Sequence, residues 1–219
     1  MKKFRELILD LLFPIQCFGC GKFNVWLCQD CFGKIEINKV DKSYFLFENQ
    51  VLLDGVWVAA DYSQVLIQKI LHSYKYNFVA DLGEVVADLL IQFFSQVVSD
   101  ELVFDLVIPV PLAKKRIIWR GFNQAEILAQ KISQQFGWMF QAKVLIRRRY
   151  TRPQVGLKAA ERKVNLQEAF KVTEPQLIRD KKILLVDDVI TTGTTMSECA
   201  RVLKQAGAKE VLGLVLAKG

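Results

Sequence analysis

The sequence predicts an α/β protein: an open parallel β-sheet flanked by helices, with a small metal-binding segment at its N-terminus. Three observations indicate this class. Short aliphatic runs alternate with segments in which apolar residues recur at helical spacing. The aliphatic runs lack polar alternation, which is typical of strands buried on both faces of a parallel sheet. Four of the five cysteines lie within residues 17–31. We therefore expect two parts, residues 1–50 and residues 51–219.

The composition is that of an ordinary folded protein. Of the 219 residues, 52% are hydrophobic and 24% are charged, and no apolar run has the roughly 20 residues that a transmembrane helix needs. Apolar residues recur at helical spacing before Pro14, which should end a short amphipathic helix. Arg5, Glu6 and Asp10 interrupt the apolar stretch and no small-residue cleavage site follows, so we expect no signal peptide and predict a cytoplasmic location. The helix either packs against the body or lies on a membrane surface.

The cysteine-rich segment, 17-CFGCGKFNVWLCQDC-31, has the spacing C-x2-C-x7-C-x2-C. Two thiolates separated by two residues can face one ion from a tight knuckle, and two knuckles complete a tetrahedron. The glycines of the first knuckle suit the unusual backbone angles of such a turn. Because the cytosol would reduce a disulfide, a metal is favoured. Four protein ligands leave no position for water, which predicts a structural zinc ion bound by Cys17, Cys20, Cys28 and Cys31.

The middle of the chain begins the alternation of strands and helices. Residues 53–63 carry apolar residues around an Asp-Gly pair and are predicted to form strands or a hairpin. Helical spacing predicts helices over residues 64–76 and 80–98. The apolar run 103–112 is predicted as a buried strand that ends in a proline-bounded loop, and residues 113–124 as a loop.

The second half continues this pattern. Residues 124–137 have helical spacing, and residues 143–150 are predicted as a strand. Residues 151–170 begin as a polar loop and become helical near residues 159–163. Three elements complete the prediction: a strand over 182–187, a helix over 195–208 with Gly207 at its C-terminal cap, and a strand over 211–217.

Positive charge is concentrated in one third of the chain. The net charge is +7, and residues 112–182 hold 17 Lys and Arg against 5 Asp and Glu, while all other residues hold 13 against 18. A basic region of this kind suits an anionic partner, namely phosphate, pyrophosphate or nucleic acid. The alternative is a solvated basic face without a ligand.

The string 183-ILLVDDVITTGTT-195 places two adjacent carboxylates and a small, hydroxyl-rich loop directly after a buried strand. In open parallel sheets, ligands bind beyond the carboxyl ends of the strands, where loops meet helix N-termini. Gly193 permits a positive φ and close approach, and the helix dipole favours an anion, so the loop suits a phosphate monoester. The carboxylates would repel that phosphate but accept hydrogen bonds from hydroxyls. A ribose 5-phosphate offers both groups.

This string resembles the phosphoribosyl-pyrophosphate (PRPP) binding motif of type I phosphoribosyltransferases. The resemblance narrows to the ComF family and spans nearly the whole chain, through the cysteine segment, 107-VIPVPLAKKRIIWRGFNQAEILA-129 and 151-TRPQVGLKAAERKVNLQEAF-170. It implies a type I phosphoribosyltransferase-like sheet in residues 51–219. Many members of the family carry more cysteines at the N-terminus than the four found here, which indicates a single zinc ion.

The resemblance also implies roles for residues of the motif. Asp187 and Asp188 would contact the ribose hydroxyls as the catalytic pair. The 5-phosphate would lie in the loop formed by Thr191, Thr192, Gly193, Thr194 and Thr195.

The resemblance also implies cationic residues that bind the pyrophosphate. The resemblance assigns Lys114, Lys115 and Arg116 to it, with Mg²⁺ bridging oxygens of pyrophosphate and ribose. Cations that stabilise the departing pyrophosphate lower the barrier to breaking its bond to carbon. A mobile basic cover that excludes water would consist of Arg120, Asn123, Gln124, Arg152, Gln154 and Arg162.

Several of these polar residues have plainer alternatives. Asn123 opens a predicted helix and would serve as its cap. Arg147, Arg148 and Arg149 close a strand whose successive residues face opposite sides, so at least one is a solvated charge. His72, the only histidine, is better explained as a packed surface residue than as a catalytic base.

Two functions of different classes are compatible with the sequence. The first is an enzyme that transfers a phosphoribosyl group from PRPP to an acceptor that the sequence does not name. The second is a module of natural competence that binds single-stranded DNA and partner proteins and retains PRPP or phosphate binding. Trp119, Phe122, Trp138 and Tyr150 lie among basic residues, as base-stacking platforms do. Phe122 and Trp138 are, taken singly, better explained as core or loop-anchoring residues.

Overall fold

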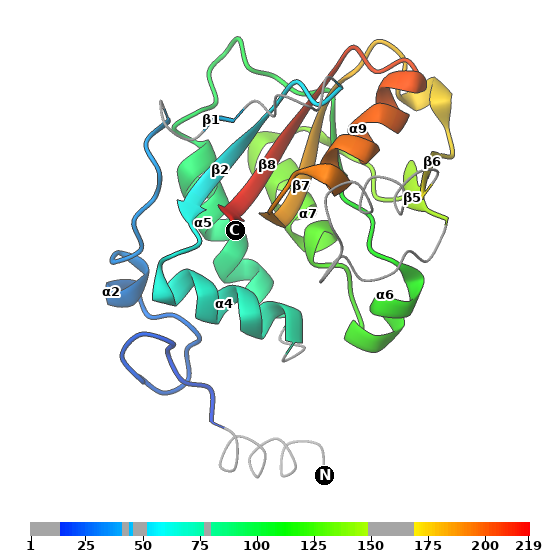
Figure 1. The fold of residues 1–219 in the computed structure, drawn as a ribbon. Coiled ribbons are helices and arrows are strands. Elements are labelled where there is room, and N and C mark those ends of the chain that lie inside the picture. The colour runs from blue at the N-terminus through cyan, green and yellow to red at the C-terminus, as the bar shows by residue number, and fades with distance from the viewer. Residues whose placement is uncertain (1–13, 41–43, 46–51, 77–79, 149–168) are drawn as a thin grey trace.

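The computed structural model describes residues 14–40, 44–45, 52–76, 80–148 and 169–219 (Figure 1). The strands of the main sheet are β1 (Tyr44–Phe45), β2 (Gly55–Asp61), β3 (Leu106–Pro109), β4 (Met139–Phe140), β7 (Lys182–Ile190) and β8 (Glu210–Lys218). The α-helices are α2 (Gln29–Phe32), α4 (Val65–Tyr76), α5 (Leu82–Phe94), α6 (Lys114–Arg120), α7 (Gln124–Phe136) and α9 (Thr194–Gln205). A 3₁₀ turn, η1 (Pro175–Leu177), precedes β7.

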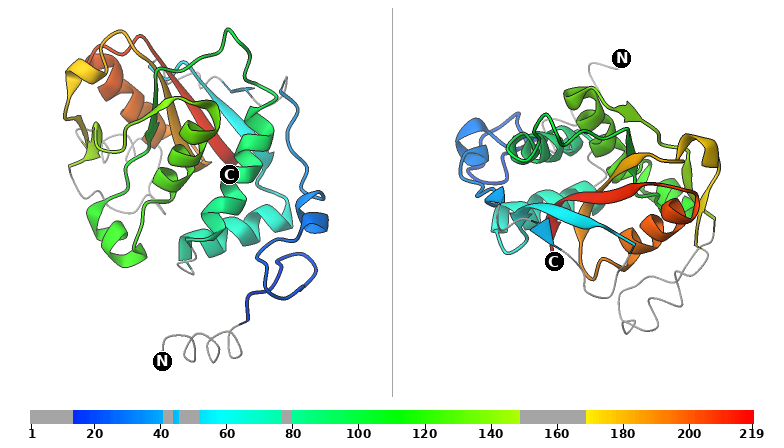
Figure 2. Two further views of the ribbon diagram at one scale, coloured as in Figure 1. Left: turned by 180° about the vertical axis from the view of Figure 1, so that it is seen from behind. Right: turned by 90° about the horizontal axis from the view of Figure 1, so that it is seen from above.

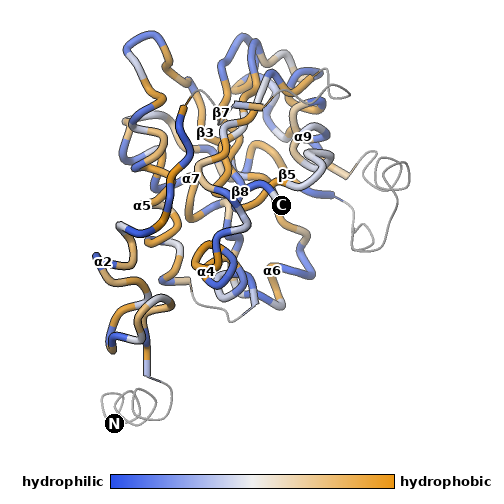
Figure 3. The backbone as a smooth tube through the Cα atoms, turned by 60° about the vertical axis from the view of Figure 1, so that its left-hand side comes forward, coloured by the Kyte–Doolittle hydropathy of each residue, from blue (hydrophilic) through white to orange (hydrophobic). Residues whose placement is uncertain are grey.

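Among the described residues, the main sheet has six strands in the order β1-β2-β8-β7-β3-β4. All pairs are parallel except β1 with β2, so the sheet is mixed only at that edge. At the centre, Val186 of β7 pairs with Leu214 of β8 on one side and with Pro109 of β3 on the other. The predicted open sheet flanked by helices is confirmed, and its central strands contain long hydrophobic stretches (Figure 3).

The two faces of the sheet carry separate hydrophobic cores. Leu184, Val186 and Leu214 belong to the core built with α4, α5 and α7. Their neighbours Leu185 and Val215 belong to the core built with α9. Successive strand residues thus face opposite layers, which explains the unbroken aliphatic runs in the sequence. Figure 2 shows α9 on one side of the sheet and α5 and α7 on the other.

The cysteine segment packs against the first of these cores. Leu27 and Ile35 are buried in the same cluster as residues of α4 and α5. The connection after α2 is tied to the domain as well, since Gln64 exchanges two hydrogen bonds with the main chain of Glu36, at 2.9 and 2.8 Å. The division into residues 1–50 and 51–219 stays a prediction. Within the ranges that the structure describes, no helix is both long and apolar enough to cross a membrane.

The region predicted as strands or a hairpin, residues 53–63, is a single strand, β2. Its antiparallel partner comes from β1, earlier in the chain. The Asp-Gly pair does not make a hairpin turn, because the Asp54 carboxylate accepts a hydrogen bond from Val211 N at 2.7 Å and anchors the start of β2 beside β8.

Two further boundaries differ from the prediction. Residues 113–124 were expected as a loop, but they contain α6, which ends at Gly121 with a left-handed φ of 85°. No residue between Ala113 and Arg120 breaks a helix, and a glycine is the usual stop. The strand expected over 182–187 extends through both aspartates to Ile190, because β8 continues to pair with it there.

The predicted strand over 143–150 forms β5 (Leu145–Arg147), outside the main sheet. It pairs in antiparallel fashion with β6 (Phe170–Val172), a strand that the sequence pattern did not suggest. The predicted N-terminal helix and the helical turn near residues 159–163 lie outside the described residues.

Candidate functional site

A cavity of about 590 Å³ opens where the strands of the sheet end. Its charged, amide and hydroxyl lining comes from the end of α4, from α6, from the start of α7 with its N-cap, from β5 and β7, and from the loop before α9 with the first turn of that helix. These residues are Lys75, Arg116, Arg120, Asn123, Gln124, Arg147, Asp187, Asp188, Thr191 and Thr195. A smaller hollow of about 130 Å³ adjoins Asp187 and is lined by residues 189–196. Four cationic side chains face the larger cavity against two carboxylates, so the cavity suits an anion.

Asp187 and Asp188 face the cavity because the two neighbours of β7 pair with it over different lengths. On one side, β8 pairs with β7 as far as Ile190, whereas β3 on the other side pairs only up to Val186. The two aspartates therefore lie beyond the end of β3, and Asp188 N donates a hydrogen bond to Asp187 Oδ1 at 2.8 Å. Burial, and secondly the charge of Asp188, raise the pKa of Asp187 to about 7.

Lys75 forms an ion pair with Asp188 at 3.0 Å, across the cavity wall. It lies in the last turn of α4, and 24% of its side chain is exposed against 8% for Asp188. Burial lowers the pKa of Lys75, but the ion pair with Asp188 and the nearby Asp187 and Tyr76 together outweigh it, so the pKa is raised. This contact could not be predicted from the sequence, since Lys75 is more than 100 residues away from Asp188 in the chain and belongs to no motif.

The loop between β7 and α9 has the shape predicted for an anion cradle. Gly193 has a left-handed φ of 73° and is the N-cap of α9, and its carbonyl accepts from Ser197 N at 2.9 Å. The hydroxyls of Thr192 and Thr194 lie 2.8 Å apart. All five predicted loop residues, Thr191 to Thr195, line the smaller hollow at the start of this 12-residue helix. Backbone N–H groups and the helix dipole favour an anion there.

The cations expected at the pyrophosphate separate in the structure. Arg116 lies in the lining of the cavity, whereas Lys114 and Lys115 are exposed on α6 and are not among the described residues that line it. A helix of 3.6 residues per turn cannot direct three successive side chains to one side, which explains the separation. The predicted loop would have allowed all three side chains to face the cavity.

Arg120, Asn123 and Gln124 were expected in a mobile cover but form part of the cavity wall. All three are buried. Asn123 is the N-cap residue of α7, yet its side chain makes no capping bond and donates instead to the carbonyl of Val110 at 3.2 Å. Arg152, Gln154 and Arg162 lie outside the described residues.

Besides Lys75, three lining residues with aromatic or charged side chains were not predicted as site residues: Tyr62, Tyr76 and Arg147. Tyr76 follows Lys75 at the end of α4, and its ring lies 5.0 Å from that of the exposed His72. Arg147 lines the cavity with its guanidinium over the Phe170 ring, 5.3 Å from the centroid. Only the fold brings these residues together, so the sequence held no local signal for them.

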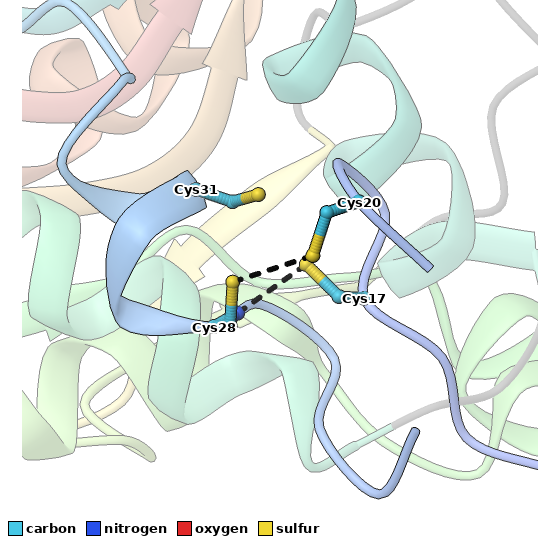
Figure 4. A group of neighbouring side chains, drawn as sticks. All are labelled: Cys17, Cys20, Cys28 and Cys31. Atoms are coloured by element: carbon cyan, nitrogen blue, oxygen red, sulfur yellow. Dashed lines mark hydrogen bonds between the residues drawn. The ribbon is translucent and has the colours of Figure 1, made fainter. Parts of the chain in front are cut away.

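The four predicted cysteines come together in one cluster. Their Sγ atoms all lie within 4.8 Å of one another, and those of Cys20 and Cys28 are 3.6 Å apart (Figure 4). Ligands about 2.3 Å from a tetrahedral Zn²⁺ would be about 3.8 Å apart, so the cluster is compatible with a structural zinc ion. Gly19 is required here, because a Cβ at that position would lie 2.5 Å from Cys31 Sγ.

The backbone around Cys17 favours a metal-binding thiolate. Burial opposes ionisation, but N–H groups of Cys20, Cys28 and Gly19 outweigh it and lower the pKa of Cys17 to about 6. The N–H of Cys28 donates to Cys17 Sγ at 3.3 Å.

Comparison with known proteins agrees with this fold. Residues 120–219 match the family model described as "Phosphoribosyl transferase domain", so the chain is a phosphoribosyltransferase-like protein. It is 32% identical over 154 residues to the DNA utilization protein YhgH of Shigella flexneri, a match that covers 69% of this chain and 66% of that protein. It is 36% identical over 108 residues to Competence protein F of Haemophilus influenzae, covering 49% of this chain and 47% of that one. The chain belongs to the ComF family.

Among solved structures, the fold resembles an "allosteric regulatory enzyme of purine biosynthesis". The TM-score is 0.40, with 22% sequence identity over 63% of this chain and 25% of that chain.

Proposed function

We propose that the protein binds PRPP together with Mg²⁺ in the cavity at the end of β7 and transfers the phosphoribosyl group to an acceptor. The observation that supports this most is that one cavity holds the acidic pair, residues of the threonine loop and a surplus of cationic side chains. PRPP offers a matching set of groups: a 5-phosphate, two neighbouring hydroxyls and a pyrophosphate.

In this proposal each part of the site takes one part of the ligand. The 5-phosphate lies in the hollow before α9, where N–H groups and threonine hydroxyls donate to it. The two ribose hydroxyls donate to Asp187 and Asp188. Lys75 occupies only Oδ1 of Asp188, so the second carboxylate oxygen remains an acceptor for a hydroxyl.

The transfer itself breaks the bond between the ribose carbon and pyrophosphate and forms a bond from that carbon to the acceptor. Positive charge develops on the ribose, and the carboxylates of the acidic pair stabilise it. Negative charge develops on the pyrophosphate, where Arg116 lies close enough to the cavity to compensate it. Mg²⁺, when bound, supplies further charge compensation on the phosphate oxygens.

We also infer that the cysteine cluster holds one Zn²⁺ with a structural role. The four thiolates complete its coordination, and the cluster contacts the core under α4 and α5.

The test is a calorimetric titration of the zinc-loaded protein with PRPP and Mg²⁺. The Asp187→Asn/Asp188→Asn variant should lose about tenfold or more in affinity, because neutral amides accept hydroxyl bonds more weakly than carboxylates. The matched control is Asp100→Asn/Glu101→Gln, which removes an adjacent, exposed acidic pair outside the cavity. Absence of PRPP binding by the parent protein would refute the proposal.

A second candidate function is binding of single-stranded DNA in natural competence. Trp119 is 55% exposed on α6, its ring lies 6.4 Å from that of Tyr76, and Lys114 and Lys115 precede it on the same helix. An exposed aromatic ring beside cations suits base stacking. Phe122 and Trp138 do not support DNA binding, because both pack on other aromatic rings of the protein. Phe122 packs on Tyr74, and Trp138 packs on Phe104 and Phe136.

The names of the relatives are the reason to test this second function. A fluorescently labelled oligonucleotide would be titrated at several salt concentrations, since phosphate contacts give a steep salt dependence. The Trp119→Ala variant should bind less tightly than the parent. If the parent protein does not bind the oligonucleotide at low salt, this second function is refuted.

A further inference from the structure

Arg120 is a buried cation in the wall of the cavity, and its hydrogen bonds are incomplete. It is the last residue of α6, only 8% of it is exposed, and it lines the larger cavity. Its Nη1 donates to Gln124 Oε1 at 2.5 Å. Its Nε has no hydrogen-bond partner among the residues that the structure describes. A buried donor on a charged group is unfavourable without a partner, and a ligand acceptor would supply one.

The charges around Arg120 do not compensate it fully. Asp188 is the carboxylate with the largest influence on it, but Asp188 is already paired with Lys75 at 3.0 Å. Arg116 adds a like charge from the same helix. The ring of Tyr76 lies 5.8 Å from the guanidinium carbon and offers a weak cation–π contact. Burial lowers the pKa of Arg120, consistent with a cation that lacks a full counter-charge.

Gln124 fixes the orientation of this guanidinium without cancelling its charge. Gln124 is 2% exposed, and its Nε2 donates to the carbonyl of Tyr74 at 3.3 Å. That bond directs Oε1 toward Arg120. The Tyr74 hydroxyl donates in turn to the Gln124 carbonyl at 3.0 Å, which holds the start of α7 against α4. An amide is a neutral acceptor, whereas a carboxylate here would neutralise Arg120.

We propose that Arg120 binds a second anionic group of the ligand, outside the threonine hollow, and that Gln124 is the positioning residue that orients it. The identification of this group as the pyrophosphate of PRPP rests on the proposed function. This role belongs to the wall of the cavity rather than to a cover, and it replaces the one expected for Lys114 and Lys115.

Inorganic pyrophosphate and ribose 5-phosphate serve as separate calorimetric probes of the zinc-loaded protein, each with Mg²⁺. Arg120→Met should lower the affinity for pyrophosphate about tenfold or more, because a charge-assisted hydrogen bond is lost. The affinity for ribose 5-phosphate should change by less than about twofold. Arg179→Met is the matched control, since Arg179 is exposed and lies outside the cavity lining. Arg120→Lys keeps the positive charge but lacks Nε, so it should weaken pyrophosphate binding less than Arg120→Met does. It is tested in place of Arg120→Met if that variant does not fold.

Gln124→Glu tests the positioning role. A carboxylate at this position pairs with the guanidinium, so pyrophosphate affinity should fall and its dependence on salt should become shallower. Ribose 5-phosphate affinity should stay near that of the parent. A purely structural role predicts instead that both affinities fall together with the melting temperature.

The outcomes separate this inference from the proposed function. Ribose 5-phosphate binding with pyrophosphate affinity unaffected by Arg120→Met would overturn the inference and leave the proposed function standing. Pyrophosphate binding that depends on Arg120, without ribose 5-phosphate binding, would support the inference and refute the PRPP assignment. A parent protein that binds no pyrophosphate overturns the inference.

Discussion

The carboxyl group of Asp187 lies where ionisation is unfavourable. Burial and the neighbouring charge of Asp188 raise its pKa from 3.8 to about 7, although the N–H of Asp188, Lys75 and Arg120 act in the opposite direction. The folded protein therefore holds the proton on Asp187 more tightly than the unfolded chain does. The site proposed to bind ligand hydroxyls thus reduces the stability of the ligand-free protein at neutral pH.

We expect Asp187→Asn to stabilise the ligand-free protein in a pH-dependent way. Between pH 3.8 and about 7 the folded state binds more protons at this position than the unfolded state, so the parent loses stability as the pH rises through that window. The variant lacks this loss and its amide oxygen can still accept from Asp188 N. Its gain over the parent should be at least about 1 kcal/mol larger at pH 8 than at pH 5. Urea unfolding at both pH values measures this.

Asp105→Asn is the control with the opposite sign. The N–H of Lys182 is the main cause that lowers the pKa of Asp105, so ionised Asp105 contributes stability above its ordinary pKa. This variant should be less stable than the parent at both pH 5 and pH 8 by a similar amount. Parallel pH curves for Asp187→Asn and the parent would contradict the account of Asp187.

At the scale of residues, the sequence could predict only those parts of the site that are adjacent in the chain. Asp187, Asp188 and the threonine loop were found because they form one continuous string after a buried strand. Lys75 and Arg147 come from separate elements, and only the strand order and the packing of α4 bring them to the cavity. Lys75 belongs to no motif, and Arg147 is one of many cations in the basic third of the chain, so nothing in the sequence distinguishes either residue.

Among the elements, the seating of α9 on the sheet determines where the threonine loop lies. Gly213 of β8 has no side chain at the point where Met196, in the first turn of α9, packs on the sheet. A Cβ at position 213 would lie 2.4 Å from Met196 Sδ and 3.0 Å from a methyl carbon of Val56. Because Met196 is 2% exposed, it has little room to move. The glycine thus permits close approach of helix and sheet.

Gly213→Ala should therefore act on the loop through α9. We expect a loss of about 1–3 kcal/mol in stability from overpacking, and weaker binding of ribose 5-phosphate because the start of α9 is displaced. The double variant Gly213→Ala/Met196→Ala removes the clashing sulfur and should recover binding relative to Gly213→Ala alone. Chemical unfolding and calorimetry measure the two effects. Equal binding by Gly213→Ala and the parent would show that the loop is independent of this contact.

The structure at α6, β7 and β6 differs from that predicted from the sequence. The polar residues of α6 were taken for a loop, although a run without helix breakers before Gly121 is equally compatible with a helix. The length of β7 depends on β8, a partner that is distant in sequence. β6 has only three residues and exists through its pairing with β5, so its own sequence carries no strand signal. Pairing between distant segments decides all of these cases except the first.

Across the whole molecule, α4 connects the cysteine cluster to the cavity. Near its start, Lys69 Nζ donates to the carbonyl of Phe18 at 3.4 Å, and Leu66 lies beside Gly19 in the first knuckle. At its end, Lys75 pairs with Asp188 and Tyr76 lines the cavity. Cys17, Cys28 and Cys31 are buried in the same hydrophobic cluster as Ile67 and Ile70 of α4. A change at the cysteine cluster can therefore reach the site through one rigid helix.

Removal of the proposed Zn²⁺ should consequently weaken both the fold and the site. We expect a strong chelator to lower the melting temperature by about 10 °C, since metal binding contributes directly to folding free energy. Pyrophosphate affinity should fall in the same sample. The end of α4 positions Lys75 and Tyr74, and this helix loses support at its start when the metal is removed. Calorimetry before chelation, after chelation and after addition of Zn²⁺ measures both effects. The Cys17→Ser/Cys28→Ser variant should resemble the chelated parent and show no further response to the chelator. A lower melting temperature with unchanged affinity would instead mean that the cysteine segment stabilises the protein without influencing the cavity.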